Sequence, residues 1–140
     1  MMLYIGIDPD VNENGVAIWN KKNKTLELYN MNFFELQKAL ELNKDKIVKV
    51  IISAGWLNKT NFHAKADFSK NKNSIIGERV GANHQVGKMI GAYCEHLNIN
   101  YILSKPKQKK LNKHEFNILT QYKKNTNQDQ RDAGLLVYGY

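Results

Sequence analysis

The chain has little cysteine, only two prolines and no long apolar run. Its single cysteine, Cys94, excludes an internal disulfide and a cysteine-cluster zinc site, and its natural place is in helix packing. No apolar stretch approaches the roughly 20 residues that a bilayer-spanning helix needs. The first residues run directly into a strand pattern instead of a basic region followed by a long apolar stretch, so we expect no signal peptide and a cytoplasmic location.

What the chain does have is positive charge. In 140 residues, 21 Lys and Arg outnumber 13 Asp and Glu, which gives a net charge of +8 and a pI near 9.5. The length and the 42% hydrophobic content match one globular domain over residues 1–140. The charge excess favours a polyanionic partner, with nucleic acid as the leading class. The alternative is a charge that serves solubility alone.

Five short, β-rich apolar segments predict strands. Pro9 ends the first segment because proline lacks the amide donor that a strand needs. Short polar turns separate the first three segments, which predicts an antiparallel meander. A helix capped by Asn32 comes next, so the fourth strand is expected to return in parallel beside the first. The predicted strands cover residues 3–7, 15–19, 25–29, 47–52 and 101–103.

Helical spacing of apolar residues predicts further helices over 78–97, 114–122 and 128–138. In the first of these, Gly87 and Gly91 lie four apart, on a face that can sit tightly on the sheet. Residues 57–77 are polar and lack a sustained period, so we expect a loop of functional length there. The order of elements predicts an α/β, RNase H-like fold: a mixed five-stranded sheet, three strands antiparallel and then parallel strands, flanked by helices.

Three aspartates stand where such a fold would gather them. Asp8 ends the first strand, at the edge where open α/β sheets bind ligands. Asp129 and Asp132 are three apart at a helix start, hence on one face. Each has an ordinary alternative: Asp8 as a turn residue before Pro9, the other two as complements to the helix dipole. Together they favour phosphodiester cleavage by two divalent metals, which requires converging carboxylates.

These residues resemble those of RuvC-like Holliday junction resolvases, particularly compact phage-type members of that family. Residues 4–9 (YIGIDP) are similar to the opening strand with its first catalytic aspartate, and residues 14–18 (NGVAI) to the glycine-initiated second strand. Residues 129–133 (DQRDA) resemble the closing pair of metal-binding aspartates. The long predicted helix and the basic segment 105–107 also follow the family pattern, so the resemblance covers nearly the whole chain.

The resemblance implies a structure-selective DNA endonuclease that resolves four-way junctions. It implies two Mg²⁺ or Mn²⁺ ions held by Asp8, Asp129 and Asp132. It also implies a homodimer, because two symmetric strands must be cut, and the long helix is the candidate dimer surface. The expected setting is a bacterial or phage-infected cell, in keeping with the abundant Asn, Lys and Ile that indicate an AT-rich genome.

One position departs from the family pattern. The family's fourth strand ends in a catalytic, metal-bridging glutamate, and the matching residue here is Ser53. A serine hydroxyl is a weaker Mg²⁺ ligand than a carboxylate, so metal occupancy and activity should fall. Three explanations remain open: an engineered inactive mutant, a natural variant that uses another acid such as Asp67 or Glu78, or a natural binding protein that does not cleave.

Basic and aromatic residues beyond the fourth strand are the candidates for nucleic-acid contact. Trp56 is expected to pack as core and His84 to be structural, although His84 can also face the site or a partner subunit. Phe62 is the candidate for stacking on bases or opening a junction. The alternative functions are a branched nucleic-acid binder without cleavage, and a nuclease acting on RNA or an RNA–DNA hybrid. The predicted contact residues are Lys59, Phe62, Lys65, Arg79, Lys105 and Lys107.

Overall fold

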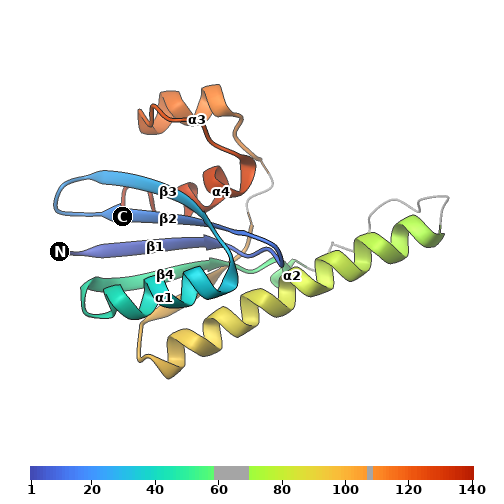
Figure 1. The fold of residues 1–140 in the computed structure, drawn as a ribbon. Helices are drawn as coiled ribbons and strands as arrows, with labels where there is room; N and C mark the ends of the chain where they lie inside the picture. The colour runs from blue at the N-terminus through green and yellow to red at the C-terminus, as the bar shows by residue number, and fades with distance from the viewer. Residues whose placement is uncertain (59–69, 107–108) are drawn as a thin grey trace.

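The computed structural model describes residues 1–58, 70–106 and 109–140. Figure 1 shows one sheet with helices on both faces. η1 and η2 are single 3₁₀ turns that the sequence patterns did not predict. In chain order the elements are β1 (Leu3–Asp8), β2 (Asn14–Asn20), β3 (Thr25–Met31), α1 (Phe33–Asn43), η1 (Lys44–Lys46), β4 (Ile47–Ser53), η2 (Gly55–Leu57), α2 (Lys70–His96), β5 (Tyr101–Ser104), α3 (Lys113–Thr120) and α4 (Gln128–Val137).

The sheet has five strands in the order β3-β2-β1-β4-β5. β1 pairs antiparallel with β2 and parallel with β4, β2 pairs antiparallel with β3, and β4 pairs parallel with β5. This confirms the predicted mixed sheet. β1, β4 and β5 all point the same way, so the ends of β1 and β4 meet at one edge of the sheet, beside the middle of α2 (Figure 1).

Each face of the sheet has its own apolar core. Alternate residues of β1 and β4, such as Ile5, Ile7 and Val50, face α1 and α2. The residues between them, such as Tyr4 and Ile51, face α3 and α4. Asn32 caps α1 with a capping box, as expected. No helix in the described part of the chain is both long and apolar enough to cross a membrane.

The start of α2 differs from the prediction. The helix begins at Lys70, so the predicted loop over 57–77 is wrong from residue 70 onward. The extra turns extend beyond the sheet (Figure 1), and residues 74–79 are exposed there, including Ile75 and Ile76. A helical segment whose described side chains are exposed to solvent needs no apolar period, which is why the sequence pattern did not reveal it.

Two glycines let α4 approach the sheet at backbone distance. A Cβ atom on Gly6 of β1 would overlap the carbonyl of Ala133, and one on Gly15 of β2 would overlap the carbonyl of Asp129. Gly87 and Gly91 do the same for α2, whose backbone lies against the rings of Trp56 and Tyr101. The tight glycine face predicted for α2 is therefore confirmed, and its contacts lie within the chain.

We predict that Gly15→Ala destabilises the protein by about 1 to 3 kcal/mol, because the added methyl group meets backbone rather than a flexible side chain. Urea unfolding measures the change. The matched control is Gly81→Ala on the exposed part of α2, where a Cβ meets nothing within 4 Å. It should stabilise by about 0.5 to 1 kcal/mol through helix propensity. Equal changes in the free energy of unfolding for the two variants would contradict the close packing of α4 on Gly15.

Candidate functional site

Asp8 and Ser53 are brought together by the parallel pairing of β1 and β4. Ile7 lies beside Ile52 in the register, and the next residue of each strand is the last one before the turn. Since side chains alternate along a strand, both Asp8 and Ser53 point to the face that α4 covers. Both line one cleft of about 300 Å³ at the carboxyl edge of the sheet. Ser53 therefore stands where the sequence placed it.

The turn after Asp8 is fixed by hydrogen bonds. The buried side chain of Asn14 accepts from the Asp10 amide at 2.9 Å and donates to the Met31 carbonyl at 3.1 Å. The Val11 amide donates to Asn83 Oδ1 of α2 at 2.9 Å. These bonds tie the turn to β3 and to α2, so the carboxylate at the end of β1 is held in place from two sides.

The start of α4 supplies the other two aspartates. Asn127 caps the helix in a capping box with Gln130. Asp129 follows in the first turn, and the close contact of its backbone with Gly15 presses it toward β1. The Asp8 and Asp129 carboxyls lie close enough together that each changes the pKa of the other. The predicted convergence of these two acids is thus present.

The paired carboxyls are electrostatically strained. Burial raises the pKa of Asp8 to about 8, and the negative charges of Asp129 and Asp132 add to the effect. The pKa of Asp129 is raised as well, first by burial and then by the charges of Asp10 and Asp132, against the lowering effect of its contact with Asp8. A cation would relieve both carboxyls. Asp10, which the sequence placed only in a turn, contributes to this negative charge by raising the pKa of Asp129.

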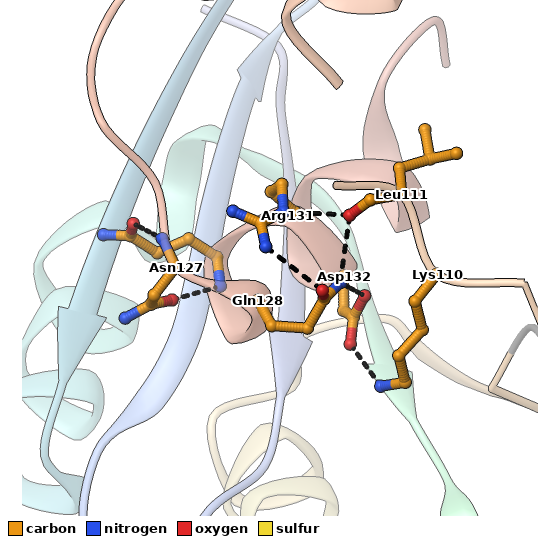
Figure 2. Close-up of polar contacts among 7 residues, drawn as sticks. Lys110, Leu111, Asn127, Gln128, Arg131 and Asp132 are labelled. Carbon is orange, nitrogen blue, oxygen red and sulfur yellow. Dashed lines mark hydrogen bonds and ion pairs between the residues drawn. The ribbon is translucent and has the colours of Figure 1, made fainter. Parts of the chain in front are cut away.

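Asp132 is engaged differently (Figure 2). Its Oδ2 pairs with Lys110 Nζ at 2.6 Å, and its Oδ1 accepts from Gln128 Nε2 at 2.8 Å. Burial disfavours the charged form of Lys110, but the hydrogen bond and charge of Asp132 outweigh this and raise the lysine pKa, with help from Asp8 and Asp129. Both oxygens of Asp132 therefore already have partners.

Lys110 reaches the acid because the segment before α3 is anchored to α4. The Leu111 carbonyl accepts from Arg131 Nε at 2.9 Å and from Gln128 Nε2 at 3.3 Å (Figure 2). Arg131 Nη1 also donates to the Thr126 carbonyl at 2.9 Å. Arg131 is thus a structural residue. The sequence pattern did not reveal this pairing, because Lys110 and its acid partner lie 22 residues apart.

The described residues fit one Mg²⁺ ion better than two. Mg²⁺ needs one or two carboxylates, with water and phosphate completing its shell, and the Asp8–Asp129 pair meets that requirement. Within the described ranges, no three His, Cys, Asp or Glu side chains converge closely enough to hold an ion. Asp132 differs from the other two aspartates because Lys110 and Gln128 contact its two oxygens, and its role as a metal ligand stays a prediction.

Aromatic residues form the opposite wall of the cleft. Trp56 packs on Gly87, lies edge-on to His84 with ring centroids 5.8 Å apart, and has Lys88 Nζ 5.7 Å from its ring. Burial lowers the pKa of His84, and the Lys88 charge adds to this. Trp56 and His84 both line the cleft. His84 therefore faces the site, and Trp56 is half-buried cleft wall rather than closed core.

The predicted nucleic-acid contacts have mixed outcomes. Arg79 is exposed on the projecting part of α2, and Lys105 is exposed directly after β5. Glu78 is also exposed on α2 and does not line the cleft, so it is not placed to replace the missing glutamate. The other predicted residues lie outside the described ranges, namely Lys59, Phe62, Lys65, Lys107 and the alternative ligand Asp67.

No protein-family model and no curated protein sequence matches the chain. Among solved structures, the fold is similar to that of RuvC from T. thermophilus, solved in complex with a Holliday junction substrate. The superposition has a TM-score of 0.52 and covers 97% of this chain and 90% of that one. The fold is RuvC-like. At 13% sequence identity, the likeness establishes this RNase H-like architecture and nothing about activity.

We predict that the metal-free protein loses stability as pH rises from about 4 to about 8. In the folded state Asp8 keeps its proton up to about pH 8, whereas in the unfolded chain it releases the proton near pH 3.8. Release of this proton by the unfolded chain therefore lowers the free energy of unfolding progressively as pH rises through this window. Asp8→Asn should remove the loss and be more stable than the parent at pH 8.5, by on the order of 2 kcal/mol.

Urea unfolding in EDTA at pH 4 and pH 8.5 measures this difference. The matched control is Asp45→Asn, an exposed aspartate in η1 at the opposite edge of the sheet. It should follow the pH profile of the parent. A parent as stable at pH 8.5 as Asp8→Asn would contradict the strained carboxyl pair.

Proposed function

We propose that this protein is a structure-selective DNA endonuclease acting on four-way junctions. The observation that carries the proposal is the Asp8–Asp129 carboxyl pair, with Asp132 beside it, at the carboxyl edge of a RuvC-like sheet. The similar RuvC protein binds a Holliday junction. The net charge of +8 suits a polyanionic substrate.

Each acid has a separate task in this proposal. Asp8 and Asp129 bind Mg²⁺ or Mn²⁺, because the negative charges of Asp129 and Asp132 beside Asp8 attract a cation, which replaces the proton that Asp8 otherwise holds. The bound ion supplies a Lewis acid for the phosphodiester and lowers the pKa of water. Ser53 contributes only a neutral hydroxyl to the same cleft. Cleavage is therefore expected to be slow compared with that of a protein carrying a carboxylate at this position.

The rim of the cleft supplies the groups for phosphate contact. Lys109 lines the cleft, and Lys105 is exposed just before it in the same segment. Arg79 extends this positive surface along α2. Such contacts position a backbone without reading its sequence, which is what recognition of branched DNA by shape requires. Trp56 and His84 present aromatic edges to the same cleft.

A homodimer is part of the proposal, because two symmetric strands must be cut. The glycine face of α2 packs within the chain, which leaves the projecting turns as the candidate surface. Ile75 and Ile76 are exposed there at 65% and 46%, and a second copy of the chain is the occupant that we propose for this surface. Sedimentation of the parent and of the double variant Ile75→Asn/Ile76→Asn tests whether this surface forms the dimer.

A binding protein without cleavage is the second candidate. Ser53 in place of an acid and the engagement of Asp132 by Lys110 both favour it. The fold and the positive charge serve junction binding equally well in either case. An RNA–DNA hybrid or a structured RNA would meet the same surface chemistry, so competition among junction, hybrid and RNA distinguishes the substrate class.

We predict weak junction cleavage by the parent and at least tenfold faster cleavage by Ser53→Glu, because the added carboxylate strengthens cation binding in the cleft. The assay uses a labelled mobile four-way junction with Mg²⁺ or Mn²⁺. Asp8→Asn in either background is the control and should abolish the products. If the parent and Ser53→Glu both bind the junction but neither cleaves it, the endonuclease proposal is refuted and the proposal of a binding protein is supported.

We predict that Lys105→Ala weakens junction binding and reduces the slope of log K against log salt by about 0.9, the value for one lost phosphate contact. Gel shifts over a range of salt concentrations measure it. Lys22→Ala is the matched control, because this exposed lysine lies in the β2–β3 turn at the opposite edge of the sheet. Equal losses for both variants would show that the cleft rim has no special role.

A further inference from the structure

We propose that the Lys110 ammonium takes the place of a second cation in this acid site, so that each chain binds one divalent ion instead of two. The inference deepens the proposed nuclease function and rests on it for its biological meaning. Its physical basis is independent of catalysis. It concerns how many positive charges are needed to neutralise the aspartates, and which of these charges is supplied by Lys110 and which by a metal ion.

The contact between Lys110 and Asp132 is direct and reinforced. The ammonium lies 2.6 Å from Oδ2, while Gln128 holds Oδ1 at 2.8 Å. The Asp132 side chain is only 17% exposed, whereas that of Lys110 is 58% exposed. The lysine therefore reaches a largely buried acid from the open rim. A divalent ion that coordinated Oδ2 of Asp132 would compete with the Lys110 ammonium, and one that coordinated Oδ1 would compete with Gln128.

The chain positions Lys110 through the residue that follows it. The Leu111 carbonyl receives hydrogen bonds from Arg131 and Gln128 of α4 (Figure 2). The Leu111 side chain packs against the core on the α4 face of the sheet. The residue that follows Lys110 is thereby anchored through both its carbonyl and its side chain, and this holds Lys110 within reach of Asp132. An unanchored surface lysine would have no such preference.

The charges at the site match a single divalent ion. When all three aspartates are deprotonated, they and Lys110 carry a net charge of −2, which one Mg²⁺ or Mn²⁺ neutralises. Asp10 acts on Asp129 from the margin and Lys109 lines the cleft, and their charges cancel. A second divalent ion would leave the cluster positive. Ser53 adds no charge to support it, in contrast to a glutamate at that position.

The test counts Mn²⁺ bound per chain, by isothermal titration calorimetry and by the electron paramagnetic resonance signal of free Mn²⁺. We expect one ion for the parent and for Lys110→Arg, which keeps the charge. Lys110→Met should bind the first ion about tenfold more tightly, because a positive charge close to it is gone. The double variant Lys110→Met/Ser53→Glu should bind two ions.

The matched control is Lys109→Met, which removes a neighbouring cleft lysine that lacks the Asp132 contact. It should leave the ion count and affinity near those of the parent. Circular dichroism confirms that every variant compared is folded. Two ions or none on the parent, or equal affinities for Lys110→Met and Lys109→Met, would overturn the inference.

Cleavage assays on the same proteins separate this inference from the proposed function. One ion per parent chain, without junction cleavage by the parent or by Ser53→Glu, refutes the nuclease and supports the role of Lys110. Two ions per parent chain together with cleavage refute the role of Lys110 and support the nuclease. The ion count and the cleavage products therefore decide the two proposals independently.

Discussion

The backbone contact of α4 with β1 and β2 is the constraint on which the rest of the site depends. Gly6 and Gly15 have no side chains, so the helix lies directly on the two strands. This approach brings Asp129 to the end of β1, close enough for its carboxyl to raise the pKa of Asp8. With any larger residue at Gly15 the helix start would stand off the sheet. The acid pair would then separate and lose its electrostatic character.

Such a pair opposes folding. Two buried carboxyls with raised pKa values and a third acid nearby are costly to bring together, and the apolar cores on both faces of the sheet offset that cost. Stored strain of this kind is typical of functional sites, because a ligand that relieves it binds strongly. In the proposed function, the same packing that stabilises the fold also creates the negative charge that a cation would neutralise.

Ser53 and Lys110 both reduce the negative charge of the cleft. Ser53 supplies no carboxylate, and Lys110 neutralises part of the charge on Asp132. Together they give a site that needs less metal charge than three free aspartates and a glutamate would. A chain that had lost one acid would be expected to accept fewer cations, and an anchored lysine is a means of keeping the remaining acids compatible with the fold.

Local patterns were sufficient for the strands and the Asn32 cap, since alternation and helix periodicity act between near neighbours. The position of Ser53 at the end of the fourth strand was predicted from the family resemblance, and the register that sets it beside Asp8 comes from the structure. Local patterns also indicated that Asp129 and Asp132 share a helix face. Tertiary structure alone decided that Asp132 pairs with Lys110, that His84 faces the cleft and that α2 begins at Lys70. Charge pairing between distant segments leaves no periodic trace in a sequence, and neither does a helical turn without a packing partner.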